Sequence, residues 1–270
     1  MNCATNRLSL AMKIKTPLIA ATLLIATTAA GRDGNLEQTL LIRPHDQPET
    51  QFDAHRLQPG RFTYRMVKDG AEIAKFTLTV EPLADGNYRF TGDAIGFEQH
   101  WESVTTRYFQ PLSAELRLQR SGGQRFAMSL HYSNGQVKGT SVETKPPVND
   151  AQPQRSEKIT VADAPSGTVD QRIDWAAMLS SHLLPGQTLK FAVYDPETGL
   201  SPVSGEAIDG KQTKVPAGAF ETNRLNYRIK KSQRTELYRL ESTRDFPRMM
   251  IREEFPDGAV TELVEAVPGK

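Results

Sequence analysis

Hydrophobic and polar residues alternate along most of the chain after Gly60. Phe62, Tyr64 and Met66 alternate with polar or charged neighbours, and turns such as Asp85-Gly86-Asn87 separate one alternating run from the next. A period of two places successive side chains on opposite faces of a β-strand, and closely spaced turns join neighbouring strands as hairpins. The pattern predicts an all-β fold, an antiparallel meander rolled into a barrel or a strongly curved sheet.

A Pro-rich loop and one helix interrupt this alternation. Residues 145–154 (KPPVNDAQPQ) combine adjacent prolines with polar side chains, which predicts a long loop. Thr168 and Gln171 have the spacing of a capping box, and apolar residues recur at helical intervals as far as Leu184-Pro185-Gly186. We expect one short amphipathic helix at about 168–184, packed on the sheet or closing one end of a barrel.

A second alternating block follows Gly186 and contains the most specific local signal, residues 215–220 (VPAGAF). Pro216 fixes φ near the value required at the first central position of a β-turn, and Gly218 adopts a positive φ without penalty. We expect a type I turn followed by a left-handed glycine, which is a common three-residue hairpin connection, with Phe220 beginning the return strand. Together the two blocks predict a single all-β domain over residues 60–266.

The first thirty residues are organised like a secretory signal peptide. Lys13 and Lys15 precede an apolar run at residues 17–25, and small residues follow as far as Ala30. Cleavage is expected after Ala30, with cleavage after Ala29 as the alternative. The apolar run is short for a transmembrane helix, so an uncleaved anchor is the less favoured interpretation.

The single cysteine agrees with export to the periplasm. Cys3 precedes the apolar run, so it cannot carry the lipid of a lipoprotein, whether translation starts at Met1 or at Met12. The mature chain would contain no cysteine, which excludes disulfides and thiol nucleophiles. Residues 31–59 are polar and are interpreted as an extended leader. We predict a periplasmic protein with no transmembrane segment after cleavage.

Composition and charge give no support to two classes of partner. The 270-residue chain is 38% hydrophobic and 24% charged, with a formal net charge of +1. Arg7, Lys13 and Lys15 lie in the signal region, which has no acidic residue, so the remainder has 30 basic and 32 acidic residues. This balance does not support binding to nucleic acid or to an anionic membrane surface.

The chain lacks the common sequence motifs of metal sites, serine nucleophiles and nucleotide-binding loops. No two histidines have the spacing that places two metal ligands on one strand or helix face, and the chain has no G-x-S-x-G, P-loop or G-x-G-x-x-G motif. Adjacent Glu253 and Glu254 should point to opposite faces of a strand, and Asp170 and Asp174 should lie in a solvated first turn of the helix. We predict no catalytic residue, no metal site and no cofactor, and we favour a protein that is not an enzyme.

Aromatic residues are the candidate ligand contacts. Trp101, Tyr108, Trp175, Phe191 and Tyr194 either line a cavity inside the curved sheet or form ordinary core. Large barrels enclose apolar ligands, whereas small barrels fill their interiors with side chains, so both interpretations stay open.

The order of short motifs along the chain is also informative. These motifs are Phe62-Thr63-Tyr64-Arg65, Tyr88, the helix from Asp170 to Leu184, Leu184-Pro185-Gly186-Gln187, VPAGAF at 215–220, and Phe246-Pro247-Arg248-Met249. In this order they resemble a family of bacterial envelope proteins, domain of unknown function 3108, over roughly residues 58–266. The chain departs from the family pattern at residues 71–74, where Gly70 stands in for a glycine between the first two strands. The resemblance implies an exported all-β fold and no established activity, so no catalytic residue carries over.

Three functions are compatible with these observations. The first is a non-catalytic periplasmic β protein that binds or handles an apolar or amphiphilic envelope component, such as a lipid. The second is a structural or protein-interaction module that assembles with other envelope proteins through an exposed sheet edge or the loop at 145–154. The third and weakest is an envelope hydrolase, which requires converging carboxylates or a Ser-His pair in a cleft.

Overall fold

The computed structural model describes residues 51–269, apart from gaps at 96–97, 120, 148–151 and 232–233. The predicted signal peptide, Cys3, the start codon and residues 31–50 of the predicted leader lie outside the described residues.

Alternating sequence becomes strand throughout the described part of the chain. The strands of the first block are β1 (Gly60–Lys68), β2 (Ala71–Pro82), β3 (Tyr88–Ile95), β4 (Gln99–Thr105), β5 (Pro111–Gln119), β6 (Arg125–Ser133), β7 (Gln136–Lys145) and β8 (Gln154–Asp163). Strand β9 (Thr168–Asp170) lies between the two blocks. The strands of the second block are β10 (Thr188–Asp195), β11 (Gly199–Ile208), β12 (Gln212–Val215), β13 (Gly218–Lys230), β14 (Thr235–Thr243), β15 (Met250–Glu254) and β16 (Val260–Pro268). The helices are α1 (Asp174–Ser180) and the 3₁₀ turns η1 (Ala54–Arg56), η2 (Ser121–Gly123) and η3 (Gln171–Ile173).

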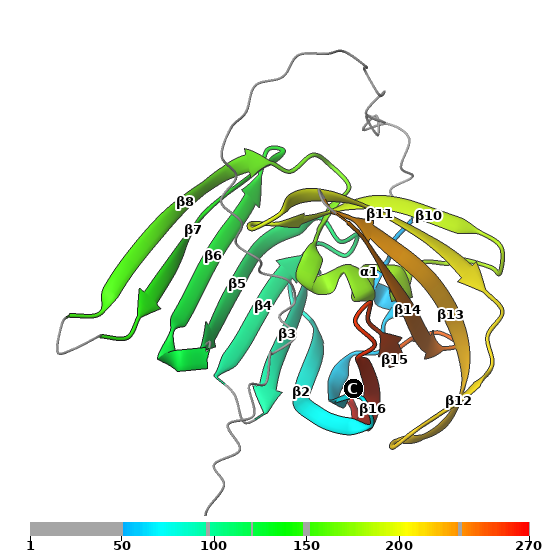
Figure 1. The fold of residues 1–270 in the computed structure, drawn as a ribbon. Helices are drawn as coiled ribbons and strands as arrows, with labels where there is room; N and C mark the ends of the chain where they lie inside the picture. Colours follow the sequence, from blue (N-terminus) through cyan, green and yellow to red (C-terminus); the bar gives the residue numbers. More distant parts are fainter. Residues whose placement is uncertain (1–50, 96–97, 120, 148–151, 232–233, 270) are drawn as a thin grey trace, which may run out of the picture. The chain divides into compact units, whose positions relative to one another are not determined.

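The strands form one 16-stranded sheet, and its first half is the predicted antiparallel meander. Strands β1 to β8 lie in sequence order, β16 pairs with β1, and the order continues through β15, β14, β13, β11 and β10 to β9 (Figure 1). Every described pair is antiparallel except β9 with β10, and β12 pairs with β13 outside the main order.

The predicted barrel does not form, because the sheet is neither closed nor strongly curled. Its two ends are β8 and β9, and no described pairing joins them. Strand β9 has three residues, and the chain turns into η3 directly after Asp170. A strand of three residues presents too few backbone hydrogen-bonding groups to pair with β8 and close the sheet.

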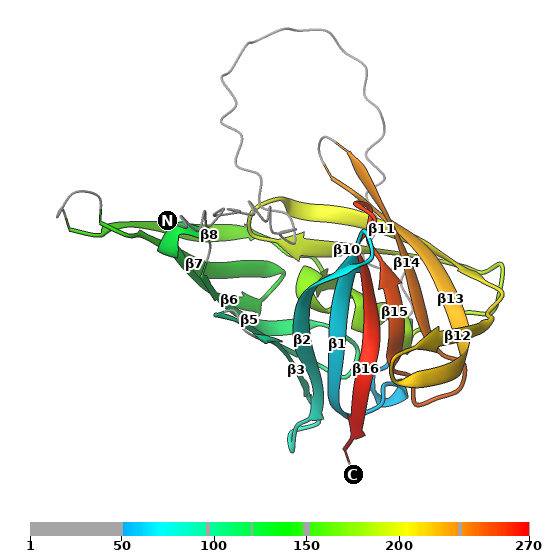
Figure 2. The ribbon, with the colours of Figure 1, turned by 60° about the horizontal axis from the view of Figure 1, so that its bottom comes forward.

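One hydrophobic core spans both blocks. We call the sheet face that contacts α1 the inner face and the opposite face the outer face. Phe62 and Phe90 of the first block share the core with Leu225 and Ile251 of the second. Helix α1 lies between the two halves of the sheet on the inner face, and all of its residues are buried (Figures 1 and 2).

The helix is shorter than its predicted range of 168–184, and the predicted capping box is wrong. Thr168 belongs to β9, where it pairs with Ala192 in parallel register. Asp170 caps η3 instead, because its side chain accepts a hydrogen bond from the Arg172 backbone N–H. Parallel pairing with β10 therefore prevails over the local helical signal. Ser181, immediately after α1, has extended φ and ψ angles.

Residues directly before β1 pack into the core. Phe52, Ala54 and Leu57 are buried, and the ring of Phe52 meets that of Phe191 edge-on at 5.1 Å. Asp53 accepts two hydrogen bonds of 2.7 Å from the guanidinium of Arg107, which lowers the pKa of the Asp53 carboxyl to about 2. The described end of the leader is thus attached to the loop between β4 and β5.

The VPAGAF segment forms a hairpin turn, although its connection is shorter than predicted. Val215 pairs with Gly218, so Pro216 and Ala217 alone connect β12 to β13. Gly218 has a φ of 137°, which confirms the predicted positive φ. The Ala217 N–H donates to the Leu263 carbonyl of β16 at 3.1 Å, so the turn is anchored to the sheet.

We predict that Gly218→Val destabilises the fold by about 1 kcal/mol or more, because a β-branched residue resists a positive φ. An added Cβ would meet no atom closer than 3.8 Å, so backbone strain rather than a clash is responsible. Urea unfolding measures the loss. Ala219→Val is the matched control and should change stability little, because Ala219 is an exposed strand position. Equal stability of both variants would show that the glycine is not needed.

Candidate functional site

The structure separates the five aromatic residues predicted as ligand contacts. Trp101, Trp175 and Phe191 belong to the main core, whereas Tyr194 packs in a smaller cluster beside Tyr132. Tyr108 is 50% exposed and lies on the surface. The five side chains therefore do not line one common space.

The two core tryptophans contact neighbouring protein groups. Trp101 lies over Gly92, where an added Cβ would come within 2.1 Å of the indole nitrogen. The Trp175 indole N–H donates to the Arg172 carbonyl at 3.1 Å, and its ring meets Phe90 edge-on at 6.3 Å.

Two buried carboxyl groups, absent from the predicted sites, lie in the core within electrostatic range of each other. Asp174 at the start of α1 is 8% exposed, and Glu253 on β15 is 7% exposed. The Tyr227 hydroxyl on β13 donates to Glu253 Oε1 at 2.6 Å, and the Trp175 backbone N–H donates to Asp174 Oδ1 at 2.6 Å. We call Asp174, Glu253 and Tyr227 the acid–tyrosine cluster.

Burial dominates the electrostatics of this cluster. It raises the pKa of Glu253 to about 7, although the hydrogen bond from Tyr227 opposes the rise. Burial also raises the pKa of Asp174 well above its usual value, and the nearby charge of Glu253 adds to that effect. The pKa values of Tyr227 and Tyr64 are raised by burial and then by Glu253. Neutral carboxyl groups therefore suit the folded interior near pH 6.

A second polar layer continues from the cluster toward the surface. The Tyr238 ring stacks on Tyr227 with centroids 4.7 Å apart, and its hydroxyl donates to Glu236 Oε2 at 2.9 Å. Lys231 Nζ lies 3.1 Å from the same carboxylate. Burial opposes ionisation of Glu236, but hydrogen bonds from Tyr238, Lys231 and Arg234 lower its pKa. This carboxylate is thus held charged while the two deeper carboxyls favour the neutral form.

The prediction that Asp170 and Asp174 lie in a solvated helical turn is wrong. Asp170 is fully buried and accepts a hydrogen bond of 3.0 Å from the Tyr132 hydroxyl. Its carboxylate also forms an ion pair with Arg172. The prediction for Glu253 and Glu254 is confirmed, because Glu253 faces the core while Glu254 pairs with Arg239 at 2.9 Å.

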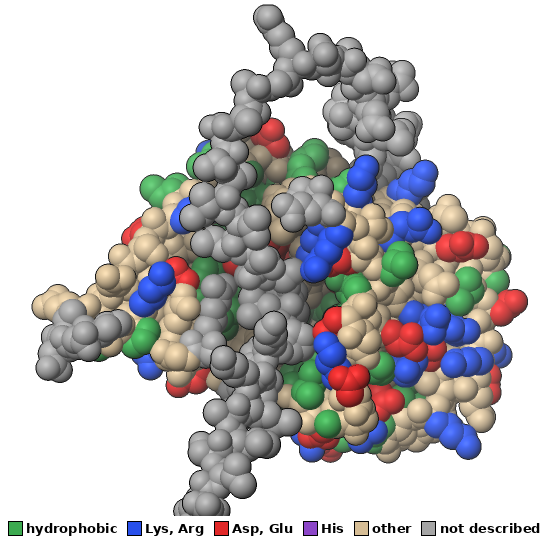
Figure 3. All heavy atoms as spheres, in the orientation of Figure 1, with side chains coloured by type: hydrophobic (Ala, Val, Ile, Leu, Met, Phe, Trp, Pro, Cys, Tyr) green, Lys and Arg blue, Asp and Glu red, His purple; other side chains and the backbone are tan. Residues whose placement is uncertain are grey.

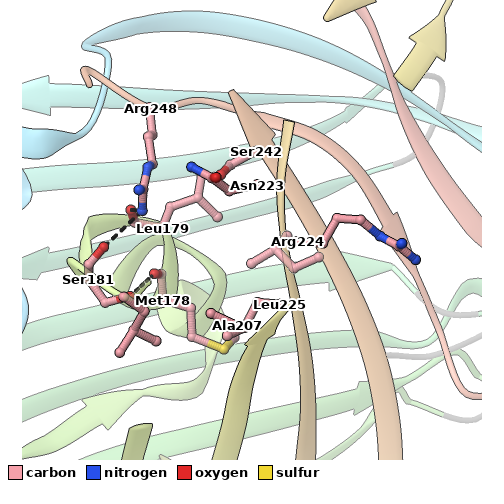
Figure 4. A pocket seen from close by; sticks show the side chains of 11 residues that line it. Met178, Leu179, Ser181, Ala207, Asn223, Arg224, Leu225, Ser242 and Arg248 are labelled. Carbon is pink, nitrogen blue, oxygen red and sulfur yellow. Dashed lines mark hydrogen bonds between the residues drawn. The ribbon is translucent and has the colours of Figure 1, made fainter. Parts of the chain in front are cut away.

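Two arginines hold the C-terminal end of α1. Arg248 donates to the carbonyls of Leu179 and Ser181 at 3.3 and 2.8 Å (Figure 4). Arg56 donates to the carbonyl of Ser180 at 3.1 Å. Burial, and then the charge of Arg56, lower the pKa of Arg248 to about 10. The cavity beside this contact measures about 30 Å³, which accommodates no more than a water molecule or two.

The guanidinium of Arg248 also lies 4.1 Å from the centroid of the Phe246 ring, and that of Arg56 lies 5.8 Å from it. The Phe246-Pro247-Arg248-Met249 motif therefore attaches the helix to the sheet.

A larger concavity lies over the second block. It is an open groove of about 710 Å³. Two cross-strand rows form most of its walls: Thr188, Glu206, Asn226, Arg239 and Glu254, then Lys190, Ser204, Arg228 and Leu237. Both rows lie on the outer face, because the intervening row contains buried Leu189 and Tyr227. Acidic and basic side chains are interspersed around this part of the surface in Figure 3, so the groove does not select one sign of charge.

The first block extends beyond the reach of α1. On the inner face of β5 and β6, Leu116, Leu118 and Phe126 are only half-buried. Cross-strand pairing continues one row from Leu116 to Met128, Ser141 and Lys158, and another from Leu118 to Phe126, Glu143 and Ser156. We call these two rows the open inner surface. Each row changes from apolar on β5 to polar on β7 and β8.

No helix among the described residues is long and apolar enough to cross a membrane. Within the same residues, no three His, Cys, Asp or Glu side chains are grouped so as to hold a metal ion.

Comparison with known proteins identifies a family without an assigned activity. The model of the family described as "protein of unknown function (DUF3108)" matches residues 50–264. No curated protein matches the chain in sequence.

Solved structures give only distant likenesses. A candidate lipoprotein from Parabacteroides distasonis is 11% identical, with 80% of this chain and 99% of that chain covered and a TM-score of 0.33. A candidate exported protein with a YmcC-like fold from Bacteroides fragilis is 10% identical, with the same coverage and a TM-score of 0.32. MucB in complex with periplasmic MucA is 11% identical, with 80% of this chain and 95% of that chain covered and a TM-score of 0.20.

We predict that the acid–tyrosine cluster makes stability fall as pH rises. Between the unfolded pKa of Glu253, near 4.5, and its folded pKa of about 7, the folded chain binds more protons than the unfolded chain. The free energy of unfolding should therefore decrease across this window. Glu253→Gln removes this contribution and should be more stable than the wild type above pH 7, by up to about 3 kcal/mol at 1.36 kcal/mol per pKa unit.

Unfolding in urea between pH 5 and pH 8 measures the effect. Glu254→Gln is the matched control, because Glu254 is ion-paired and its pKa is lowered. A Glu253→Gln variant with the wild-type pH profile would contradict the assignment.

We further predict that Arg248→Met destabilises the fold by about 2 kcal/mol or more, because it leaves buried carbonyls at the end of α1 without donors. Methionine retains most of the apolar stem, which isolates the lost hydrogen bonds. Arg244→Met is the control, since the Arg244 side chain is 52% exposed and pairs only with Glu221 among the described ion pairs. Urea unfolding at pH 7 compares the two, and equal losses would refute a specific role for Arg248.

Proposed function

We propose a role for this chain, which belongs to the DUF3108 family of proteins of unknown function, from its own geometry. It is a non-catalytic, exported β protein that binds an apolar or amphiphilic molecule of the cell envelope, such as a lipid. Export is supported by the signal-like sequence at residues 1–30. The absence of an enzymatic role is supported by the burial of Asp174 and Glu253, neither of which lines the cavity or the groove described above.

The observation that carries this proposal is the gradient across the open inner surface. Leu116 and Leu118 present half-buried apolar side chains beside β4, and the same cross-strand rows end in Lys158 and Ser156 on β8. An amphiphile matches this arrangement when its chain lies along β5 and β6 and its polar end reaches β8. Of the predicted ligand contacts, Trp101 joins this surface, because it pairs with Leu116.

A second candidate role is that of a protein-interaction module of the envelope. It is favoured by the edge of β8 that no described strand pairs with, since Ile159 and Val161 on this strand are 74% and 63% exposed. Large exposed apolar side chains on a free strand edge commonly mark sites of strand pairing. The loop at 145–154 adjoins this edge in sequence, although residues 148–151 lie outside the described part. Hydrolysis has the least support, because Asp174 and Glu253 are buried.

We predict that the protein binds a fluorescent sixteen-carbon fatty acid and that Leu118→Arg weakens binding by about tenfold or more. Burying a leucine contributes about 1.5–3 kcal/mol, and a factor of ten in affinity is about 1.4 kcal/mol. Titration monitored by fluorescence, supported by native mass spectrometry of the protein as isolated, measures the affinity and any retained lipid.

Ala127→Arg is the matched control. Ala127 is exposed on the outer face of β6 and should tolerate the same substitution without loss of binding. Absence of binding to the wild type, or equal loss in both variants, would refute the proposed surface.

A further inference from the structure

The edge of β8 that faces away from β7 is long and regular, and no strand among the described residues pairs with it. Strand β8 pairs with β7 from Gln154 to Asp163 with no register shift, and it is the last strand of the sheet on that side (Figures 1 and 2). No proline interrupts the strand, and no described strand pairs with its other edge. Such an edge presents a row of backbone N–H and C=O groups to another chain.

The side chains of β8 limit which chain can pair there. Ile159 and Val161 share the outer face and are 74% and 63% exposed. Arg155, Glu157 and Asp163 lie on the same face because side chains alternate along a strand. The apolar pair is thus followed by Asp163 on its C-terminal side and preceded by Glu157 and then Arg155 on its N-terminal side.

We propose that β8 pairs antiparallel with β8 of a second copy of this chain, about a two-fold axis at Ile159. In this register the two Ile159 side chains face each other, and Arg155 faces Asp163 of the second copy at both ends. Glu157 then faces Val161, so no like charges meet. The inference rests on the second candidate role above in using the same sheet edge, and it names the partner.

Neighbouring registers are less favourable. Moving the axis by one residue toward the N-terminus places Lys158 opposite Lys158 of the second copy. Moving it one residue the other way places Glu157 opposite Asp163. Like charges directly opposite destabilise a strand pair, whereas opposite charges and β-branched pairs stabilise it. The charge pattern of β8 therefore favours the register centred on Ile159 over both neighbouring registers, and this register is self-complementary, as a two-fold interface requires.

The predicted dimer joins the two sheets through a single pair of strands. An interface this narrow is small by the standard of permanent dimers, so association should depend on concentration. The open inner surface remains uncovered, because Leu116 and Leu118 lie on the inner face, away from Ile159.

Sedimentation velocity on the protein, expressed at full length in a host that exports it, tests the proposal from about 1 to about 500 µM, a range that spans weak association. The wild type should shift from one chain to two. I159K places two positive charges at the axis and should weaken dimerisation by about tenfold or more. L237K is the matched control, because Leu237 is 61% exposed on β14, a strand paired on both sides. A monomeric wild type at every concentration would overturn the proposal, as would I159K dimerising like the wild type.

Charge exchange tests the register itself. R155D and D163R should each weaken dimerisation, and the double variant should restore it, because the two charges then face each other with their signs reversed. Failure of the double variant to recover would refute this register and the self-pairing built on it. Titration with the fluorescent fatty acid separates the two proposals, since all β8 variants should bind it like the wild type. Loss of dimerisation with unchanged fatty-acid binding would support self-pairing, whatever the affinity for the fatty acid.

Discussion

The whole fold depends on covering one apolar face of an open sheet. A closed barrel buries its inner face against itself, but this sheet ends at β8 and β9 without joining. The seven residues of α1 and the segment around Phe52 and Leu57 cover the inner face instead. Their position is set by hydrogen bonds to the helix end from Arg56 and Arg248. Because α1 is too short to be stable alone, these contacts and the burial of its side chains must hold it in place.

Covering the sheet in this way brings two ionisable carboxyl groups into the interior. Asp174 begins α1, so docking the helix carries its carboxyl to the inner face, where Glu253 already points inward from β15. Tyr227 donates a hydrogen bond to the Glu253 carboxyl, and the Trp175 backbone N–H donates one to the Asp174 carboxyl. No described cation contacts either carboxyl, so the neutral forms relieve the cost of burial. The fall in stability that we predict between about pH 4.5 and pH 7 therefore originates where helix and sheet meet.

Sequence patterns predicted most of the fold and little of the site. Alternation and turns such as 85–87 act through neighbouring residues, so the strands and the meander could be predicted. Thr168 and Gln171 satisfied a local helical rule, yet pairing of β9 with β10 took precedence, and this pairing is not local. Asp174 and Glu253 are distant in sequence, so their proximity in the core could not be predicted. One signal was available, because Glu253 occupies an inward position two residues after Ile251, where a core residue would be expected.

Helix α1 and the main core cover one half of the sheet much more fully than the other half. Strands β1 to β4 and β10 to β16 contribute most of the main core, whereas Met128 and Leu130 of β6 and Val137 of β7 belong to a smaller cluster. The far strands are therefore held mainly by their ladder of backbone hydrogen bonds, and their faces and edge remain accessible. The two halves of the sheet therefore have different roles. One half builds a rigid core around the helix, and the other presents an inner surface and a strand edge that face different directions and can act independently.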